Sequence, residues 1–463
     1  MKEQDQDQYY LEKASIPKAI LHLCVPMILA MSANVIYSIV NAYFIGTLHD
    51  TAMLTAITVG LPVLSLSMAI GGMFGVGGGT YISRLMGEKN TEDIKHVSSF
   101  SFYAGIIASA VIALICLLFI NPLVHLLGTD SLSFGPARDY AGYLLLFLPV
   151  MTAAIVTGQI VRSIGAAKES MYGMLIGVAA NFVFDVIFIL VLHMNVTGAA
   201  LAVGLSNLAS LLYYGWFLRS KKKEISLDVK DIRFSKRFLM PIFSIGLSEI
   251  VMSSFMIVSV VLFSNFAVLY SDDVIAALGV SQRIVQVPEL LSMGIFFGIM
   301  PLMGYAYGSK DYARLKKAIW CCIVAIAGNV IIFSSALFLF RDQIFHWFSQ
   351  SSSVISLGVS ILTALLVSTL FNGFTGLLIA YFQSTNKPMQ TTVMSVVQGV
   401  LFIPVIFIAH AFLGLKGIIW SMTITEATTF ILGIALFLFR KEKSASTDDP
   451  DSDAETMVLV LEN

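Results

Sequence analysis

The chain has 463 residues, of which 57% are hydrophobic and only 12% are charged. This composition excludes an ordinary soluble protein, because too few charged groups are available to cover its surface. The formal net charge of −1 indicates no partner by itself, and we expect no nucleic acid among the partners. The four cysteines have no metal-ligand spacing, so we interpret them as packing residues and expect no metal site.

Apolar segments of about 20 residues or more recur along the chain. A helix of that length crosses a hydrocarbon core of about 30 Å and satisfies its own backbone hydrogen bonds there. The twelve segments lie at roughly 17–45, 53–83, 98–120, 139–161, 170–193, 197–218, 238–267, 274–304, 319–340, 354–382, 390–411 and 415–439. We therefore predict an all-α integral membrane protein with twelve transmembrane helices.

Positive charge is distributed unequally between the two sides of the predicted membrane. If the loops alternate between inside and outside, 24 of the 28 Lys and Arg residues fall inside and three fall outside. Loops rich in Lys and Arg remain in the cytoplasm. We therefore expect a multi-pass membrane protein with both termini in the cytoplasm.

The second half of the chain repeats the first. GEKNTEDIKHV (residues 87–97) aligns with GSKDYARLKKA (308–318) at an offset of 221 residues, and RSIGAAKESM (162–171) aligns with YFQSTNKPMQ (381–390) at an offset of 219. Such internal repeats are typical of transporters. Each copy contains six helices, so both copies have the same orientation. The pseudo-twofold axis then runs along the membrane normal.

These patterns predict two pseudo-symmetric six-helix lobes, residues 1–218 and 238–440. A basic cytoplasmic linker, 219–237, joins the lobes, and the acidic tail, 441–463, is expected to be disordered. The glycine-rich stretch from Gly71 to Gly79 lacks the Lys-Ser/Thr of a phosphate loop. We interpret it as a site of close helix packing.

Five ionisable residues fall deep within the apolar segments, where each charge costs about 2.5–3.5 kcal/mol even on a lenient scale. They are Asp185, Glu249, Arg283, Glu289 and Glu426. None of them aligns with an acidic or basic residue in the other copy. The scaffold is duplicated and the charges are not, which suggests that the charges were added for function.

Two polar helix faces predict an ion-coupling site in the first lobe. Asp185 follows Asn181 by four residues, so both lie on one face of the fifth helix. Asn34, Tyr37 and Asn41 line one face of the first helix. We hypothesise that the two faces meet, with Asp185 binding the coupling proton or sodium ion beside Asn181, Asn41 and Tyr37. Alternatively, Asp185 is a protonated group that only hydrogen-bonds a neighbouring helix.

A second stripe predicts a substrate-binding surface on the eighth helix. Gln282, Gln286, Glu289 and Met293 follow the spacing i, i+4, i+7 and i+11. We hypothesise that Glu289 attracts a cationic, partly apolar substrate and that flexible Met293 tolerates varied shapes. Asn34 of the first helix is assigned to the same surface.

The remaining deep charges each have more than one possible role. Arg283 lies one position off the stripe and is expected to pair with Glu249 or Glu289. Glu249 and Glu426 are candidates for a gate, a second ion site or a hydrogen bond between helices.

Several segments together resemble the multidrug and toxic compound extrusion (MATE) family, in particular its MepA-like bacterial branch. The resemblance runs from about Tyr9 to Arg440. It is carried by YSIVNAYFIG (37–46), FGVGGGTYISRLMG (74–87), RSIGAAKESMYGML (162–175), NFVFD (181–185), TGAALAVGLSN (197–207), QVPELLSMG (286–294) and FQSTNKP (382–388).

This resemblance implies cation-coupled antiport that expels hydrophobic organic cations by alternating access between two lobes around a central cleft. It implies an ion site at Asn181 and Asp185 and a bending point at Pro26 of the first helix. The chain departs from many relatives at Asn41, where they have aspartate. A monomeric transporter without catalytic activity or a bound cofactor is expected, in contact with membrane lipids and with small organic cations.

Three other membrane functions agree less well with the sequence. A lipid-linked oligosaccharide or lipid flippase of the same superfamily would line its cleft with basic residues, whereas acidic residues prevail here. A non-transporting receptor or scaffold would not need unpaired intramembrane carboxylates. A major-facilitator transporter would carry a basic motif between its second and third helices, which RLMGEKNTED lacks.

Overall fold

The computed structural model describes residues 3–46, 51–127, 129, 131–221, 225–348 and 350–444. Within these residues the structure is helical and contains no strand. Its elements are α1 (Glu3–Glu12), α2 (Ile16–Gly46), α3 (Thr51–Gly87), α4 (Thr91–Leu118), α5 (Ile120–Leu126), α6 (Phe134–Ser163), α7 (Ala167–Asp185), the π-helix η1 (Val186–Val191), α8 (Asn195–Lys221), the 3₁₀-helix η2 (Val229–Asp231), α9 (Lys236–Val268), α10 (Asp272–Gly308), α11 (Tyr312–Leu339), α12 (Arg341–Phe348), α13 (Ser352–Ser384), α14 (Pro388–Leu413) and α15 (Leu415–Ser444).

Twelve of these helices are long and apolar enough to cross a membrane, which confirms the predicted number of spans. The first runs from Ile16 and the last ends at Leu438. The short helices α1, α5 and α12 were not predicted, because a helix of 7 to 10 residues leaves too little periodic pattern to recognise. The chain is therefore a multi-pass membrane protein.

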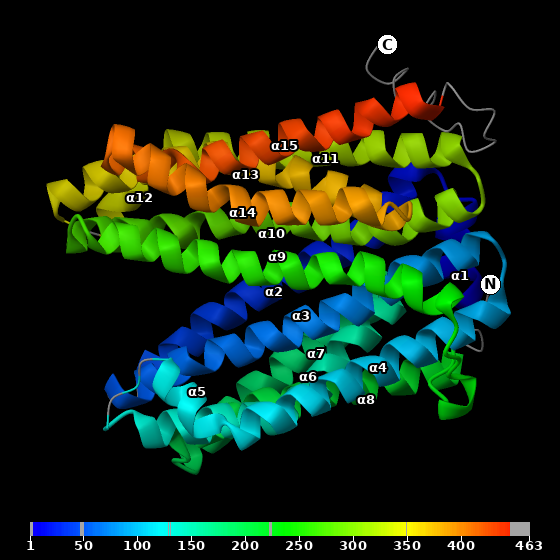
Figure 1. Ribbon diagram of the computed structural model, residues 1–463, viewed down its shortest axis with the longest axis horizontal. Coiled ribbons are helices and arrows are strands. Elements are labelled where there is room, and N and C mark those ends of the chain that lie inside the picture. The colour runs from blue at the N-terminus through cyan, green and yellow to red at the C-terminus, as the bar shows by residue number, and fades with distance from the viewer. Residues whose placement is uncertain are drawn as a thin grey trace. The chain divides into compact units, whose positions relative to one another are not determined.

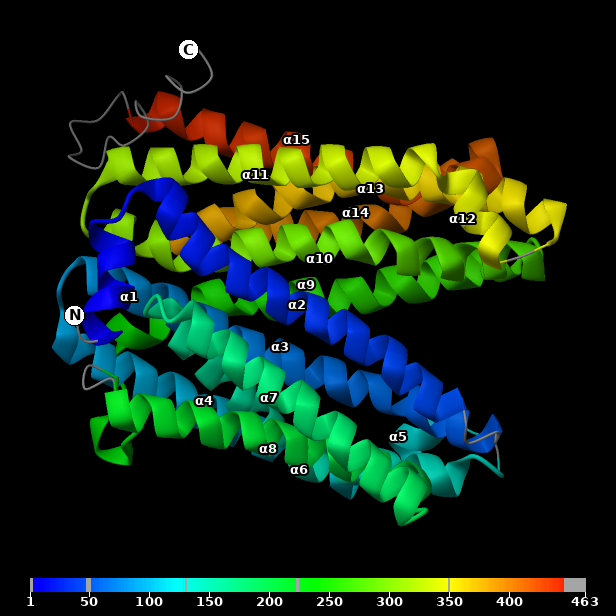
Figure 2. The ribbon, with the colours of Figure 1, turned by 180° about the vertical axis from the view of Figure 1, so that it is seen from behind.

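The chain forms two compact units. Unit 1 contains residues 1–13 and 29–250, and unit 2 contains residues 14–28 and 251–463. Unit 1 is built on the packing of α6 against α3 and α8 and of α7 against α8, and these helices run side by side in both views (Figures 1 and 2). Unit 2 repeats the three pairs as α10 with α13, α13 with α15, and α14 with α15. The sequence repeat is thus a repeat of helix packing.

The repeat extends to the helix termini. The side chain of Asn90 accepts a hydrogen bond from Asp93 N at the start of α4, and that of Asp311 accepts one from Arg314 N at the start of α11. Each cap follows a lysine in the left-handed region, Lys89 with φ 59° and Lys310 with φ 57°. Both caps satisfy an N–H group that the first helical turn leaves without a partner.

The helices α2 and α9 are each divided between the two units, at residues 28/29 and 250/251. Glycines allow the first part of each helix to pack closely in its unit. In unit 2, a Cβ atom added to Gly298 of α10 would lie 2.7 Å from Cys24 Cα of α2. In unit 1, a Cβ atom added to Gly77 of α3 would meet the carbonyl oxygen of Ile242 on α9. Gly77 and Gly298 correspond at the offset of 221 residues. These contacts support the interpretation of the glycine-rich stretch as a site of close helix packing.

We expect Gly77→Val to destabilise unit 1, because its side chain would overlap the backbone of α9. Overpacking of this kind typically costs about 1–3 kcal/mol. The thermal unfolding midpoint in detergent should fall. Gly328→Val is the matched control, because a Cβ atom there meets no heavy atom within 4 Å. Equal midpoints for the two variants would contradict the close contact.

Candidate functional site

Asp185 is the last residue of α7 and is almost completely buried, with 1% of its surface exposed. Asn181 lies one turn earlier and is 5% exposed. The hydroxyl group of Tyr140 on α6 lies within electrostatic range of the Asp185 carboxyl group. The ring of Tyr140 is itself fixed, because it lies against Gly60 of α3 where a side chain would overlap it. The buried carboxyl group thus has a tyrosine of α6 in its vicinity, and α3 fixes the ring of that tyrosine.

The α-helical hydrogen-bond pattern ends at Asp185. The next six residues, η1, form a π-helix, and Leu192 N donates to Ile187 O at 2.9 Å. The turn then closes with His193 and Asn195 in the left-handed region. π-helical turns are rare and are found most often at functional sites. The apolar segment VIFILV gave no sequence signal for this feature.

The Asn181 amide nitrogen is buried and has no hydrogen-bond partner among the residues that the structure describes. A buried donor without a partner costs free energy, so this group is suited to a bound water or ligand. The other residues of the predicted ion site lie on α2. The side chains of Asn34, Tyr37 and Asn41 lie outside the described part of the structure, so their meeting with Asp185 stays a prediction.

Unit 2 contains a second buried carboxyl group, Glu426 of α15, which is 6% exposed. Gln398 of α14 donates from Nε2 to Glu426 Oε1 at 2.8 Å, and Asn372 of α13 lies beside the same carboxyl group. Glu289 of α10 lies within electrostatic range of Glu426. Four helices thus bring two carboxyl and two amide groups together, and we call these four residues the unit 2 polar cluster.

A further side chain supports the turn of α10 that carries Glu289. Asn329 of α11 donates from Nδ2 to Pro288 O at 3.0 Å and to Ser292 Oγ at 2.9 Å. The backbone hydrogen bond that proline removes is the one to the carbonyl group four residues earlier, so Asn329 does not replace it but ties this turn of α10 to α11. Sequence reasoning missed Asn329, Asn372 and Gln398, because it concentrated on ionisable residues and each amide lies on a different helix.

The predicted substrate stripe is divided between two environments. Glu289 and Met293 are half-buried, whereas Gln282 and Gln286 are exposed. The structure brings Glu289 together with Glu426, which sequence analysis did not connect with it. A substrate-binding role of the stripe stays a prediction.

Glu249 is buried in unit 1 with 9% of its surface exposed. Its Oε2 atom would lie 3.3 Å from a Cβ atom at Gly72, so the carboxyl group lies against the glycine-rich stretch of α3. The buried Arg162 of α6 is within electrostatic range of it and donates to Gln159 Oε1. Arg283, which was predicted to pair with Glu249 or Glu289, is exposed, and its pairing stays a prediction.

Pro26 is buried inside α2, which runs through it without a break in the helix assignment. The division between the two units passes between Ile28 and Leu29, within a turn of Pro26. Bending at Pro26 stays a prediction, although a proline is a common cause of a helix kink.

Comparisons with known proteins place this arrangement. A model of the MatE family matches residues 26–187 and 244–408. The chain is 36% identical over 440 residues to multidrug export protein MepA of Staphylococcus saprophyticus, covering 95% of this chain and 97% of the relative. It is 34% identical over 446 residues to the protein of the same name from Staphylococcus aureus, covering 96% and 99%.

Solved structures share the fold. One is an outward-facing multidrug resistance MATE family transporter of the MOP superfamily, with a TM-score of 0.86 at 23% identity over 93% of this chain and 97% of that one. Another is a MOP superfamily transporter from Pyrococcus furiosus, with a TM-score of 0.85 at 23% identity and the same coverage.

Proposed function

Because the chain belongs to the MatE family, we propose that it is a multidrug efflux transporter that exchanges organic cations for protons or sodium ions across the bacterial plasma membrane. The relatives named as multidrug export proteins match nearly the whole chain. The proposal includes alternating access, cytoplasmic termini and a monomeric state.

The burial of Asp185 carries the coupling part of the proposal. An ionised carboxylate at 1% exposure is costly, and binding of a cation lowers that cost. A proton neutralises the carboxylate by bonding to a carboxylate oxygen, and a hard cation such as sodium does so with carboxylate and amide oxygens as ligands. Binding and release of that cation change the charge of the site, which gives the two states of a transport cycle different stabilities.

The distribution of charge supports a cationic cargo. Asp185, Glu289 and Glu426 lie within membrane-spanning segments of α7, α10 and α15. Basic groups also lie within spans, but the buried Arg84 and Arg162 are in the last turns of α3 and α6, and Arg283 of α10 is exposed. A lipid-linked oligosaccharide flippase would need basic groups to hold pyrophosphate, so export of organic cations agrees better with this arrangement.

Transport of ethidium by the purified protein in sealed vesicles tests the proposal. A proton gradient is imposed at equal sodium concentrations, and a sodium gradient is imposed at equal pH. We expect ethidium to move against its gradient under one of the two conditions, which identifies the coupling ion. Failure of both gradients to drive ethidium or a second organic cation would contradict the function.

A further inference from the structure

The segment between α8 and α9 is fixed on the surface of α4. The hydroxyl groups of Ser98 and Ser99 both donate to Ser226 O at 2.9 Å, and Tyr103 OH donates to Leu227 O at 2.9 Å. The backbone N–H of Ser226 donates back to Ser98 Oγ at 3.3 Å. A connecting segment that would otherwise be solvated is therefore held by hydrogen bonds to one helix.

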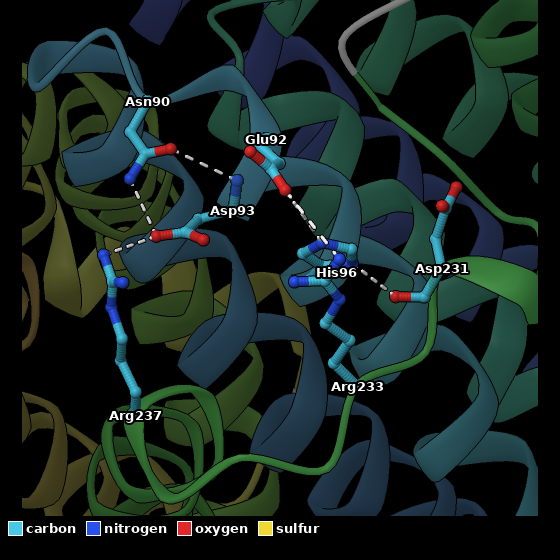
Figure 3. A network of polar contacts seen from close by, with 7 residues as sticks. All are labelled: Asn90, Glu92, Asp93, His96, Asp231, Arg233 and Arg237. Carbon is cyan, nitrogen blue, oxygen red and sulfur yellow. Dashed lines mark hydrogen bonds and ion pairs between the residues drawn. The ribbon is translucent and has the colours of Figure 1, made fainter.

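The following residues are held by a second set of contacts, shown in Figure 3. His96 Nδ1 lies 2.7 Å from Asp231 O, and Arg237 pairs with the largely buried Asp93 at 2.6 Å. Arg233 lies 3.8 Å from Glu92, but both side chains are mainly exposed, so that pair is weak. The segment is thus ordered from Ser226 to Arg237.

The docked segment exposes both apolar and basic side chains within eight residues of sequence. Phe234 is 81% exposed and Val229 is 63% exposed, although the ring of Phe234 contacts Phe100 edge-on at 5.8 Å between centroids. Lys230 and Lys236 are exposed in the same stretch. We call these residues, Val229, Lys230, Phe234 and Lys236, the linker patch. Large apolar side chains exposed beside ammonium groups are typical of a membrane–water interface.

The position of the linker patch in the chain agrees with that environment. The patch follows a span that ends at Ser220 and extends to Lys236, the first residue of the next span, so it is at a membrane surface. Residues 219–237 contain eight Lys or Arg and three Asp or Glu. Juxtamembrane basic segments attract anionic lipids.

We propose that the linker patch binds the headgroup of an anionic phospholipid. The phosphate oxygens interact with the ammonium groups of Lys230 and Lys236, while Phe234 and Val229 enter the boundary of the acyl chains. The hydrogen bonds to α4 hold the patch in place before the lipid arrives, which lowers the entropy lost on binding. The binding does not depend on which substrate or ion the protein transports.

Native mass spectrometry of the full-length protein with equal amounts of phosphatidylglycerol and phosphatidylcholine tests the proposal. We expect the tightest bound lipid to be phosphatidylglycerol. Lys230→Gln/Lys236→Gln should reduce its affinity about ten- to thirtyfold, because each basic group contributes about a fivefold preference. Phe234→Ser should weaken both lipids and leave their ratio unchanged, because it removes only apolar contact.

Lys168→Gln/Lys317→Gln is the matched control, because it removes two exposed charges from the beginnings of α7 and α11, which lie on the same membrane face when the spans alternate in direction. It should retain the tightly bound phosphatidylglycerol. Equal losses of phosphatidylglycerol affinity in the two double variants would overturn the proposal. It would also be overturned if the unmodified protein retained phosphatidylcholine as well as phosphatidylglycerol. Displacement of the lipid by millimolar inorganic phosphate would also overturn it, since the patch would then be a site for free phosphate.

Discussion

Asp185→Asn should abolish gradient-driven export while leaving the protein folded. The side chains have nearly the same shape, but an amide cannot gain or lose the charge that couples the cation to the transport cycle. We expect ethidium export under an imposed gradient to fall at least about tenfold, which lies within the usual range for loss of the coupling between two binding sites. The measurement is the initial rate of ethidium export from vesicles.

Thermal stability separates this loss from a folding defect. A buried amide costs less than a buried carboxylate, so the unfolding midpoint of the variant should be equal to or above that of the unmodified protein. Asp139→Asn is the matched control, because Asp139 is exposed on α6 and the same change there should alter neither transport nor stability. Full gradient-driven export by Asp185→Asn would show that Asp185 only hydrogen-bonds a neighbouring helix.

The sequence was sufficient for the features that the bilayer dictates. Apolar segments long enough to span it predicted all twelve spans, because only helices and closed barrels satisfy the backbone in lipid and these segments lack the short alternating pattern of barrel strands. The cost of a buried charge identified Asp185 and Glu426, which the structure shows to be 1% and 6% exposed. The spacing of four residues placed Asn181 beside Asp185, and both are buried.

The sequence was not sufficient to show which helix faces meet. Helical periodicity assigns Gln398 and Glu426 to faces of two helices, but their hydrogen bond depends on the rotation of each helix about its own axis. Rotation is set by packing, as where Gly399 of α14 lies against the ring of Phe255. The electrostatic interaction of Glu289 with Glu426 was missed for the same reason.

The unit 2 polar cluster gives the second large effect that we expect. Glu289 and Glu426 interact electrostatically, so we infer that they act together on one cation rather than independently. Glu289→Gln and Glu426→Gln should each lower ethidium export about tenfold. The double variant should be little worse than either single variant, because groups that act as a unit show strongly non-additive effects.

A double-mutant cycle on initial export rates measures this coupling. Glu88→Gln provides the control cycle, because Glu88 is exposed at the end of α3. Its replacement should not lower the export rate, either alone or in combination with Glu289→Gln. A neutral substrate measured in parallel tests the role of charge, since Glu289→Gln should reduce export of the cation more than export of the neutral compound. A loss of about a hundredfold in the double variant would mean that the two single losses multiply and that Glu289 and Glu426 act at separate sites. Glu289 would then function as part of the substrate stripe and not as part of the unit 2 polar cluster.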